Sequence, residues 1–198
     1  MLLRILVCVK QVIDSDIPSA AYVLDDSALT VVSPQGVPPI INGFDEIAVE
    51  AALQIKENNE AHVTVVSVGY KFSMDVIKKP LSMGADELVL VEDERFIDLD
   101  SFNTVFVLKS LIEYLGGFDL IICGRQASDW DNAQVPQGIA EFLDISCVTT
   151  AQKIDVSDDS LVVNRVLNDG IEVVQADLPA LITVSNELGE PRYANLKG

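Results

Sequence analysis

The sequence is short of the residues on which most catalytic and metal sites depend. Its 198 residues include one histidine, His62, and three widely spaced cysteines with no CxxC pair, at Cys8, Cys123 and Cys147. A lone histidine excludes histidine triads and histidine-rich metal centres, and the cysteine spacing indicates neither a zinc knuckle nor a redox dithiol. Scattered cysteines in apolar runs suit a reducing compartment, so we expect a cytoplasmic protein without a metal.

Basic residues and long apolar runs are also scarce. Thirteen Lys and Arg stand against 31 Asp and Glu, which gives a formal net charge of −18 at pH 7. Nucleic-acid binding depends on clustered Lys and Arg, so we expect no nucleic-acid partner. No stretch approaches the roughly 18 apolar residues of a membrane-spanning helix, so we expect no membrane insertion. The apolar start at 5–9 is too short for a secretory signal, and no small-residue cleavage site follows it.

The common nucleotide and hydrolase motifs are missing. The chain contains no GxGxxG, no GxxxxGK[ST] and no GxSxG. These absences count against a standard dinucleotide fold, a P-loop NTPase and a serine hydrolase. A nucleotide-cleaving or adenylating enzyme would need a glycine-rich phosphate loop such as SGGxD, which is also absent. We therefore expect no enzyme with a full acid–base constellation, although carboxylates abound.

What the sequence does contain is an alternation of apolar strands and amphipathic helices. Hydrophobic residues make up 49% of the chain, enough for a sizeable core. Short Val- and Ile-rich runs predict strands, and apolar residues at helical spacing predict the helices between them. The expected strands are 4–9, 62–68, 87–91 and 119–123, and the expected helices are 42–58, 73–83, 100–114 and 135–143. Pro80 should kink or end the second helix, and Gly84 should cap it.

The order of these elements predicts the fold class. Strands and helices alternate up to residue 143, which is typical of a parallel sheet with helices on both faces. Strands at 147–156, 161–167, 171–176 and 180–184 follow, and the short turns at 157–159 and 168–170 predict hairpins. We expect one α/β domain over 1–198, with a mostly parallel, doubly wound sheet and an antiparallel annex at about 146–185. The polar stretch 10–39 predicts a working loop, with short edge strands at 22–24 and 30–32.

Two segments are candidate binding sites because each lies where a strand gives way to a helix. The loop 124–135 follows the carboxyl end of a parallel strand, where open α/β sheets bind ligands, and the next helix begins with unpaired N–H groups that suit phosphate. Asp129 and Asp131 oppose an anion there, and they could instead cap the helix. Trp130 could stack on a base, contact a partner or merely cover the loop.

The second segment is Asn42–Asp45. Asn42 and Gly43 suit a turn with exposed backbone groups, and either Asn42 or Asp45 can cap the helix that follows. An ordinary helix entry is the alternative interpretation. Cys8 ends the first strand and is by default a core residue.

Several segments together carry a family resemblance. They occur in order along nearly the whole chain: LVCVKQVID (6–14), INGFDEIAVEAALQIKE (41–57), VTVVSVG (63–69), SMGADE (82–87), FDLIICGRQASDWDNAQVPQGIAEFL (118–143), LPALITVS (178–185) and EPRYANLK (190–197). In these motifs the chain resembles the β subunit of electron transfer flavoproteins.

The resemblance implies a heterodimer that carries electrons, in which this chain is a carrier subunit and not itself an enzyme. The α subunit would hold most of a redox-active FAD, and the β subunit would bury AMP or, in electron-bifurcating members, a second FAD. Electrons would pass from an acyl-CoA or other flavin dehydrogenase to a membrane-linked or other acceptor. The implied nucleotide-binding residues are Cys8, Asn42, Gly43, Phe44, Asp45, Val68, Gln126, Ala127, Ser128, Asp129, Trp130, Asp131, Asn132, Ala133, Gln134 and Val135.

The chain departs from the family pattern in places. Gly43 stands where many relatives have proline, and Trp130 and Asn132 replace a small residue and a threonine of the bifurcating members. The run Ala133-Gln134-Val135 resembles the bifurcating branch, so the choice between AMP and FAD stays open.

The resemblance also implies a dehydrogenase-recognition loop at about 188–198. Its residues are Pro191, Arg192, Tyr193 and Leu196, with Leu196 as the protruding anchor. A stand-alone adenine-nucleotide sensor that needs no α partner is the rival interpretation of the same segments.

Overall fold

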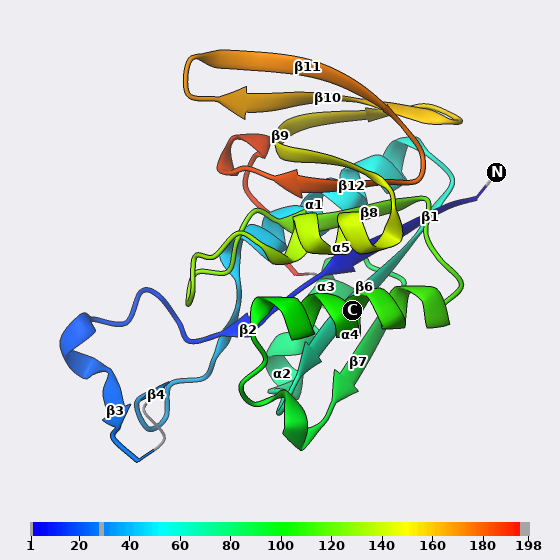
Figure 1. Cartoon of the computed structure of the whole chain (residues 1–198). Helices are drawn as coiled ribbons and strands as arrows, with labels where there is room; N and C mark the ends of the chain where they lie inside the picture. Colours follow the sequence, from blue (N-terminus) through cyan, green and yellow to red (C-terminus); the bar gives the residue numbers. More distant parts are fainter. Residues whose placement is uncertain (1, 28–29, 195–198) are drawn as a thin grey trace.

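The computed structural model describes residues 2–27 and 30–194, and it is built around an eight-stranded sheet in the order β11-β10-β9-β12-β8-β1-β6-β7. Six neighbouring strands of this sheet run parallel (Figure 1): β1 (Leu3–Cys8), β6 (Ala61–Gly69), β7 (Glu87–Glu92), β8 (Leu120–Gly124), β9 (Ser146–Val156) and β12 (Ala180–Val184). Helices cover both faces of this parallel part. The predicted α/β class is therefore confirmed.

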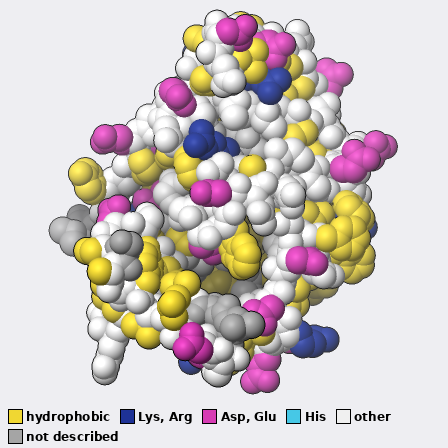
Figure 2. Space-filling view, turned by 60° about the vertical axis from the view of Figure 1, so that its left-hand side comes forward, with side chains coloured by type: hydrophobic (Ala, Val, Ile, Leu, Met, Phe, Trp, Pro, Cys, Tyr) yellow, Lys and Arg dark blue, Asp and Glu magenta, His cyan; other side chains and the backbone are white. Residues whose placement is uncertain are grey.

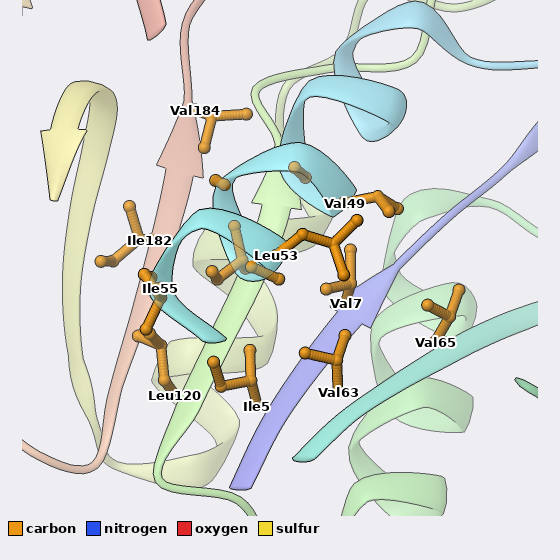
Figure 3. Packing of buried hydrophobic residues seen from close by; sticks show 14 of the residues in the cluster. Ile5, Val7, Val49, Leu53, Ile55, Val63, Val65, Leu120, Ile182 and Val184 are labelled. Carbon is orange, nitrogen blue, oxygen red and sulfur yellow. The ribbon is translucent and has the colours of Figure 1, made fainter. Parts of the chain in front are cut away.

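The first face carries the larger core. Helix α1 (Gly43–Asn58) places Val49, Leu53 and Ile55 against the centre of the sheet, and the short helices α2 (Met74–Ile77) and α3 (Lys79–Met83) add Ile77 and Met83. Figure 3 shows these α1 side chains directed at the apolar residues of β1, β6, β8 and β12. Such continuously apolar strands are typical of a sheet that is covered on both sides.

The opposite face is covered by α4 (Ser101–Tyr114) and α5 (Val135–Leu143). Val105, Leu108 and Ile139 pack there against Leu6 and Ile121, which point away from α1. Alternate residues of one strand thus serve the two cores. Among the described residues, no helix is both long and apolar enough to cross a membrane.

The C-terminal strands follow the prediction except in one element. β9 (Ser146–Val156), β10 (Ser160–Leu167) and β11 (Gly170–Asp177) form an antiparallel meander, as the short turns predicted. The expectation that the annex is antiparallel up to residue 185 is wrong for β12, which lies between β8 and β9 and runs parallel to both. Ile182 and Val184 reach the main core there, so burial of this strand decided its place.

Pro80 breaks the predicted helix 73–83 slightly earlier than expected. α2 ends at Ile77, and α3 starts at Lys79 with Pro80 in its first turn, where a missing N–H does no harm. Gly84 ends α3 with φ of 127°, a conformation that favours glycine, as predicted.

The weakly structured stretch after β1 leaves the main body. β2 (Gln11–Val12) pairs with β5 (Ile40–Ile41) at its base, and β3 (Val23–Asp25) pairs with β4 (Thr30–Val32) farther out. The two expected edge strands therefore pair with each other and not with the main sheet. Three short 3-10 helices complete the described elements: η1 (Ser19–Ala21), η2 (Glu94–Phe96) and η3 (Asn186–Leu188).

Candidate functional site

The candidate site lies at the edge of the sheet where its parallel strands end. Cys8 is in register with Val66 of β6 and Cys123 of β8, so β1 and β8 finish at the same level. β6 continues for three more residues, to Gly69, and includes Val68. Both α1 and α5 begin at this edge. Figure 2 brings this side of the molecule forward and shows few Lys and Arg side chains on it. An anion bound here would find few basic side chains on this surface (Figure 2).

Asn42 joins the two segments that the sequence predicted separately. It is the N-cap residue of α1 and is fully buried, yet its side chain makes no capping hydrogen bond. Its amide Nδ2 donates to the carbonyl of Gln126 at 2.8 Å, and its Oδ1 accepts from the N–H of Ser128 at 3.1 Å. The expected side-chain cap is therefore wrong, because the loop uses both ends of the amide.

Asp45 ties the same helix to the strands. Its carboxylate accepts the Lys10 N–H at 2.8 Å, so it does not cap α1 either. Burial, which leaves the residue 7% exposed, raises the pKa of Asp45 to about 7. Hydrogen bonds from Lys10, Asn42 and Gly124 act in the opposite direction and are outweighed. A carboxyl group of this kind can change its charge near neutral pH.

Gly124 allows α1 to approach the end of β8. A Cβ atom added to Gly124 would overlap the Asp45 carboxylate and lie 2.8 Å from the carbonyl carbon of Phe44. No larger residue fits without movement of the helix start. The loop that begins after Gly124 is therefore set directly against the first turn of α1.

The two loop carboxylates are neutralised or used locally. Asp129 pairs with the Lys10 ammonium group at 2.7 Å, and Asp131 accepts from the Gln126 side chain at 2.7 Å. Neither caps α5, whose N-cap residue is Gln134, so the capping interpretation is wrong for both. The pairing with Lys10 removes much of the repulsion that Asp129 would exert on an anion.

The backbone of the loop is unusual between these carboxylates and α5. Asp131 and Ala133 have φ of 52° and 51°, in the left-handed region that non-glycine residues rarely occupy. Such conformations concentrate at ligand-binding loops, where neighbouring contacts maintain them. Asn132 between them donates to the Ser101 hydroxyl at 3.5 Å, at the start of α4.

The remaining loop residues form a backbone turn, lie exposed to solvent or pack against the second core. The carbonyl of Ala127 accepts from the N–H groups of Trp130 and Asp131 and closes a turn. The Trp130 side chain is 73% exposed, so it does not fill the interior of the loop. Val135 begins α5 and is half-buried against the second core.

Sequence reasoning missed two cations at this edge. Lys10 follows β1 directly, and its backbone and side chain bind Asp45 and Asp129. Arg125 follows β8, and its guanidinium group stacks on the Phe44 ring at 4.7 Å from the ring centre. The Arg125 Nε is buried without a hydrogen-bond partner among the described residues. Their positions just after two parallel strands were the available signal.

The expected recognition residues differ in their contacts and in their exposure to solvent. The Arg192 side chain donates to Glu50 at 2.7 and 2.9 Å and to Glu57 at 2.7 Å, which fixes the chain to α1. Pro191 is half-buried beside it, whereas Tyr193 is 95% exposed. Burial opposes ionisation of Glu50, but its hydrogen bonds from Arg192 prevail and lower its pKa. Leu196, the expected anchor, lies outside the described residues.

Comparison with known proteins gives a consistent result. The family model described as "Electron transfer flavoprotein domain" matches residues 29–198. An electron transfer flavoprotein subunit beta from Thermoanaerobacterium thermosaccharolyticum is 40% identical over 196 residues, 99% of this chain and 73% of the relative. Two further relatives are each 38% identical, over 99% of this chain and 73% of the relative: the caffeyl-CoA reductase-Etf complex subunit CarD of Acetobacterium woodii and the acryloyl-CoA reductase electron transfer subunit gamma of Anaerotignum propionicum. The chain belongs to the electron transfer flavoprotein β subunit family.

Proposed function

We propose that this chain holds an adenine nucleotide at the carboxyl edge of its sheet and works as the β half of a heterodimeric electron carrier. One observation carries the nucleotide site. The fully buried Asn42 fixes the loop 126–135 against the start of α1 while leaving the first N–H groups of that helix uncapped. Uncapped N–H groups at a helix start, with the helix dipole behind them, form a natural phosphate site.

The residues present fit such a ligand. The N–H groups of Gly43 and Phe44 lie in the first turn of α1, and Gly124 keeps the strand end clear beside them. Lys10 neutralises Asp129, and the buried Arg125 Nε has hydrogen-bonding capacity to spare. In this proposal α1 and the loop bind the phosphates, and the strand ends at Cys8 and Val68 contact the ligand through their backbone.

The proposal leaves the nucleotide as AMP or a second FAD. FAD, when bound in the heterodimer, supplies the redox chemistry, whereas AMP would only stabilise the site. Two relatives are named as parts of caffeyl-CoA and acryloyl-CoA reductase systems, which supports a flavin dehydrogenase as partner. The outward position of Trp130 removes one objection to the larger ligand, since the indole does not occupy the loop interior.

The dehydrogenase would be recognised by the segment around Tyr193. The three hydrogen-bonded oxygens of Glu50 and Glu57 hold Arg192, so this arginine positions the segment and is not free to bind a partner itself. Tyr193, almost fully exposed next to it, is then the described residue best placed for contact. Leu196 stays a prediction as the anchor.

Reconstitution of the carrier tests this function. The full chain is co-expressed with the α subunit of the same organism, and flavin reduction by a cognate acyl-CoA dehydrogenase is followed by absorbance. We expect a 1:1 heterodimer whose flavin is reduced by the dehydrogenase. A chain that stays unpaired yet binds adenine nucleotide would support the stand-alone sensor instead.

A further inference from the structure

The described residues 13–27 and 30–39 belong to an arm that leaves the body of the protein at the nucleotide edge. The arm departs after β2 and returns at β5, and these two strands pair with each other at its base. Its outer part is the β3–β4 hairpin, which projects away from the main sheet at the lower left of Figure 1. Lys10, just before β2, binds both Asp45 and Asp129, so the base of the arm is fixed to the candidate site.

The arm is held together mainly by its own short-range contacts. The Tyr22 hydroxyl donates to the Asp14 carbonyl at 3.3 Å, and the N–H of Val37 donates to the Pro34 carbonyl at 3.1 Å. The β3–β4 sheet is separate from the main sheet and has only three residues in each strand. A two-stranded sheet of this size is at best marginally stable in water by itself.

Apolar side chains lie exposed on both faces of this hairpin. Val23 is opposite Val32 on one face, and Leu24 is opposite Val31 on the other. Their exposed fractions are 47%, 37%, 69% and 44%, in that order. Neither buried hydrophobic cluster of residues 2–27 and 30–194 includes any of the four. Exposed apolar residues on both faces of a projecting hairpin are typical of a segment that inserts into a partner.

The acidic charge of the arm indicates the chemistry of the surface that it would bind. Residues 13–39 contain four aspartates, Asp14, Asp16, Asp25 and Asp26, and no Lys or Arg. In the lower half of Figure 2, hydrophobic side chains reach the surface among acidic ones. A complementary surface is therefore an apolar groove with a basic rim. A second copy of this chain, with its net charge of −18, is a poor match.

We propose that the β3–β4 arm docks into an apolar groove with a basic rim on the α subunit. This proposal rests on the proposed function, which supplies the heterodimer. A hairpin too small to be stable alone needs a cover that stays in place, and permanent interfaces are the more hydrophobic class. The permanent α subunit meets that need, whereas a dehydrogenase that binds only during electron transfer does not. The arm then connects the subunit interface to Lys10 and the nucleotide edge.

The test measures the dissociation constant of the heterodimer with the full chain. Leu24→Asp and Val31→Asp are made together, because both residues lie on one face of the hairpin. The matched control is Ile97→Asp, which alters an apolar residue that is 64% exposed just after η2. We expect the double variant to bind the α subunit at least about thirtyfold more weakly, as for loss of a single interface anchor. The control should bind like the unaltered chain.

Charge reversal gives a second variant that leaves the apolar residues in place. Asp16→Lys with Asp26→Lys should weaken the heterodimer several-fold at low ionic strength, and the difference should shrink as salt screens the charges. Melting temperatures of all variant chains should match the unaltered chain, because neither the arm nor Ile97 contributes to the two described cores.

Four outcomes would overturn the proposal. Unchanged affinity in the Leu24 and Val31 double variant would show that the arm is outside the interface. An intact heterodimer that has lost only dehydrogenase-driven reduction would assign the arm to the dehydrogenase. Self-association of the unaltered chain that the variant abolishes would assign it to a second copy. An unaltered chain that does not bind the α subunit at all would refute the proposed function and the docking together.

Discussion

Replacement of Gly124 by alanine tests the close approach on which the site depends. The new methyl group would overlap the Asp45 carboxylate and lie 2.8 Å from the carbonyl carbon of Phe44. The Phe44 atom belongs to the backbone of the first turn of α1, so it cannot rotate away as a flexible side chain would. The end of β8 and the start of α1 must therefore move apart.

The size of the effect follows from the overpacking. Forcing an extra methyl group into a close-packed place costs about 1–3 kcal/mol. For a chain of this length each kcal/mol lowers the melting temperature by roughly 2–4 °C, so about 2 kcal/mol corresponds to a drop of roughly 4–8 °C. The separation also widens the space between the start of α1 and the loop 126–135, so the α–β complex should retain less nucleotide.

Gly170→Ala is the matched control for this variant. No atom lies within 4 Å of a Cβ placed at Gly170, which begins β11 far from the site. Its melting temperature should change by no more than about 1–2 °C, as for ordinary surface substitutions. Differential scanning calorimetry compares the three chains. Equal melting temperatures and equal nucleotide content in all of them would refute the argument from close approach.

Three further predictions follow from the buried polar contacts. Asn42→Ala leaves two half-buried backbone groups, the Gln126 carbonyl and the Ser128 N–H, without their side-chain partner, so thermal denaturation should show a loss of about 2 kcal/mol together with poor nucleotide retention. The raised pKa of Asp45 means that the folded chain binds the Asp45 proton more tightly than the unfolded chain does, so the stability that this proton contributes is lost as pH rises through about 7. The urea midpoint of Asp45→Asn should therefore not fall over this pH range. The urea midpoint of Asp98→Asn, which alters an exposed carboxylate, should still fall. Arg192→Gln should cost about 2 kcal/mol at pH 7. Because the pKa of Glu50 is lowered, the difference in stability should vanish as acid protonates Glu50. An Arg192→Gln chain that is as stable as the unaltered chain at pH 7 would contradict the role of Arg192 in fixing its segment to α1.

The sequence could predict most of the elements because its local signals agree with the fold. The helix α5 and the strand β12 begin and end where the apolar pattern placed them, and Asn42 stands at the start of α1. These features depend on periodicity and on residues that end a helix, which act over a few positions. The two helix starts at one edge followed from the parallel order of the strands.

What the sequence could not predict depends on contacts between distant residues. The sequence offers Asn42 or Asp45 as the cap of α1, but a partner 84 residues away uses the Asn42 amide. From the sequence, Asp129 opposes an anion, but in the fold the ammonium group of Lys10, 119 residues away, neutralises it. The short link between β11 and β12 suggests a hairpin, but β12 does not pair with β11 and instead lies between β8 and β9. In each case burial and long-range pairing outweighed the local preference.

Identification of the nucleotide in the α–β complex tests the central claim most directly. The purified heterodimer is denatured, and the released small molecules are identified and counted by mass spectrometry, with the α subunit alone as the reference. We expect one adenine nucleotide per heterodimer beyond those released by the α subunit, either AMP or a second FAD, and less of it from Asn42→Ala. A heterodimer that releases no additional adenine nucleotide would contradict the assignment of the site.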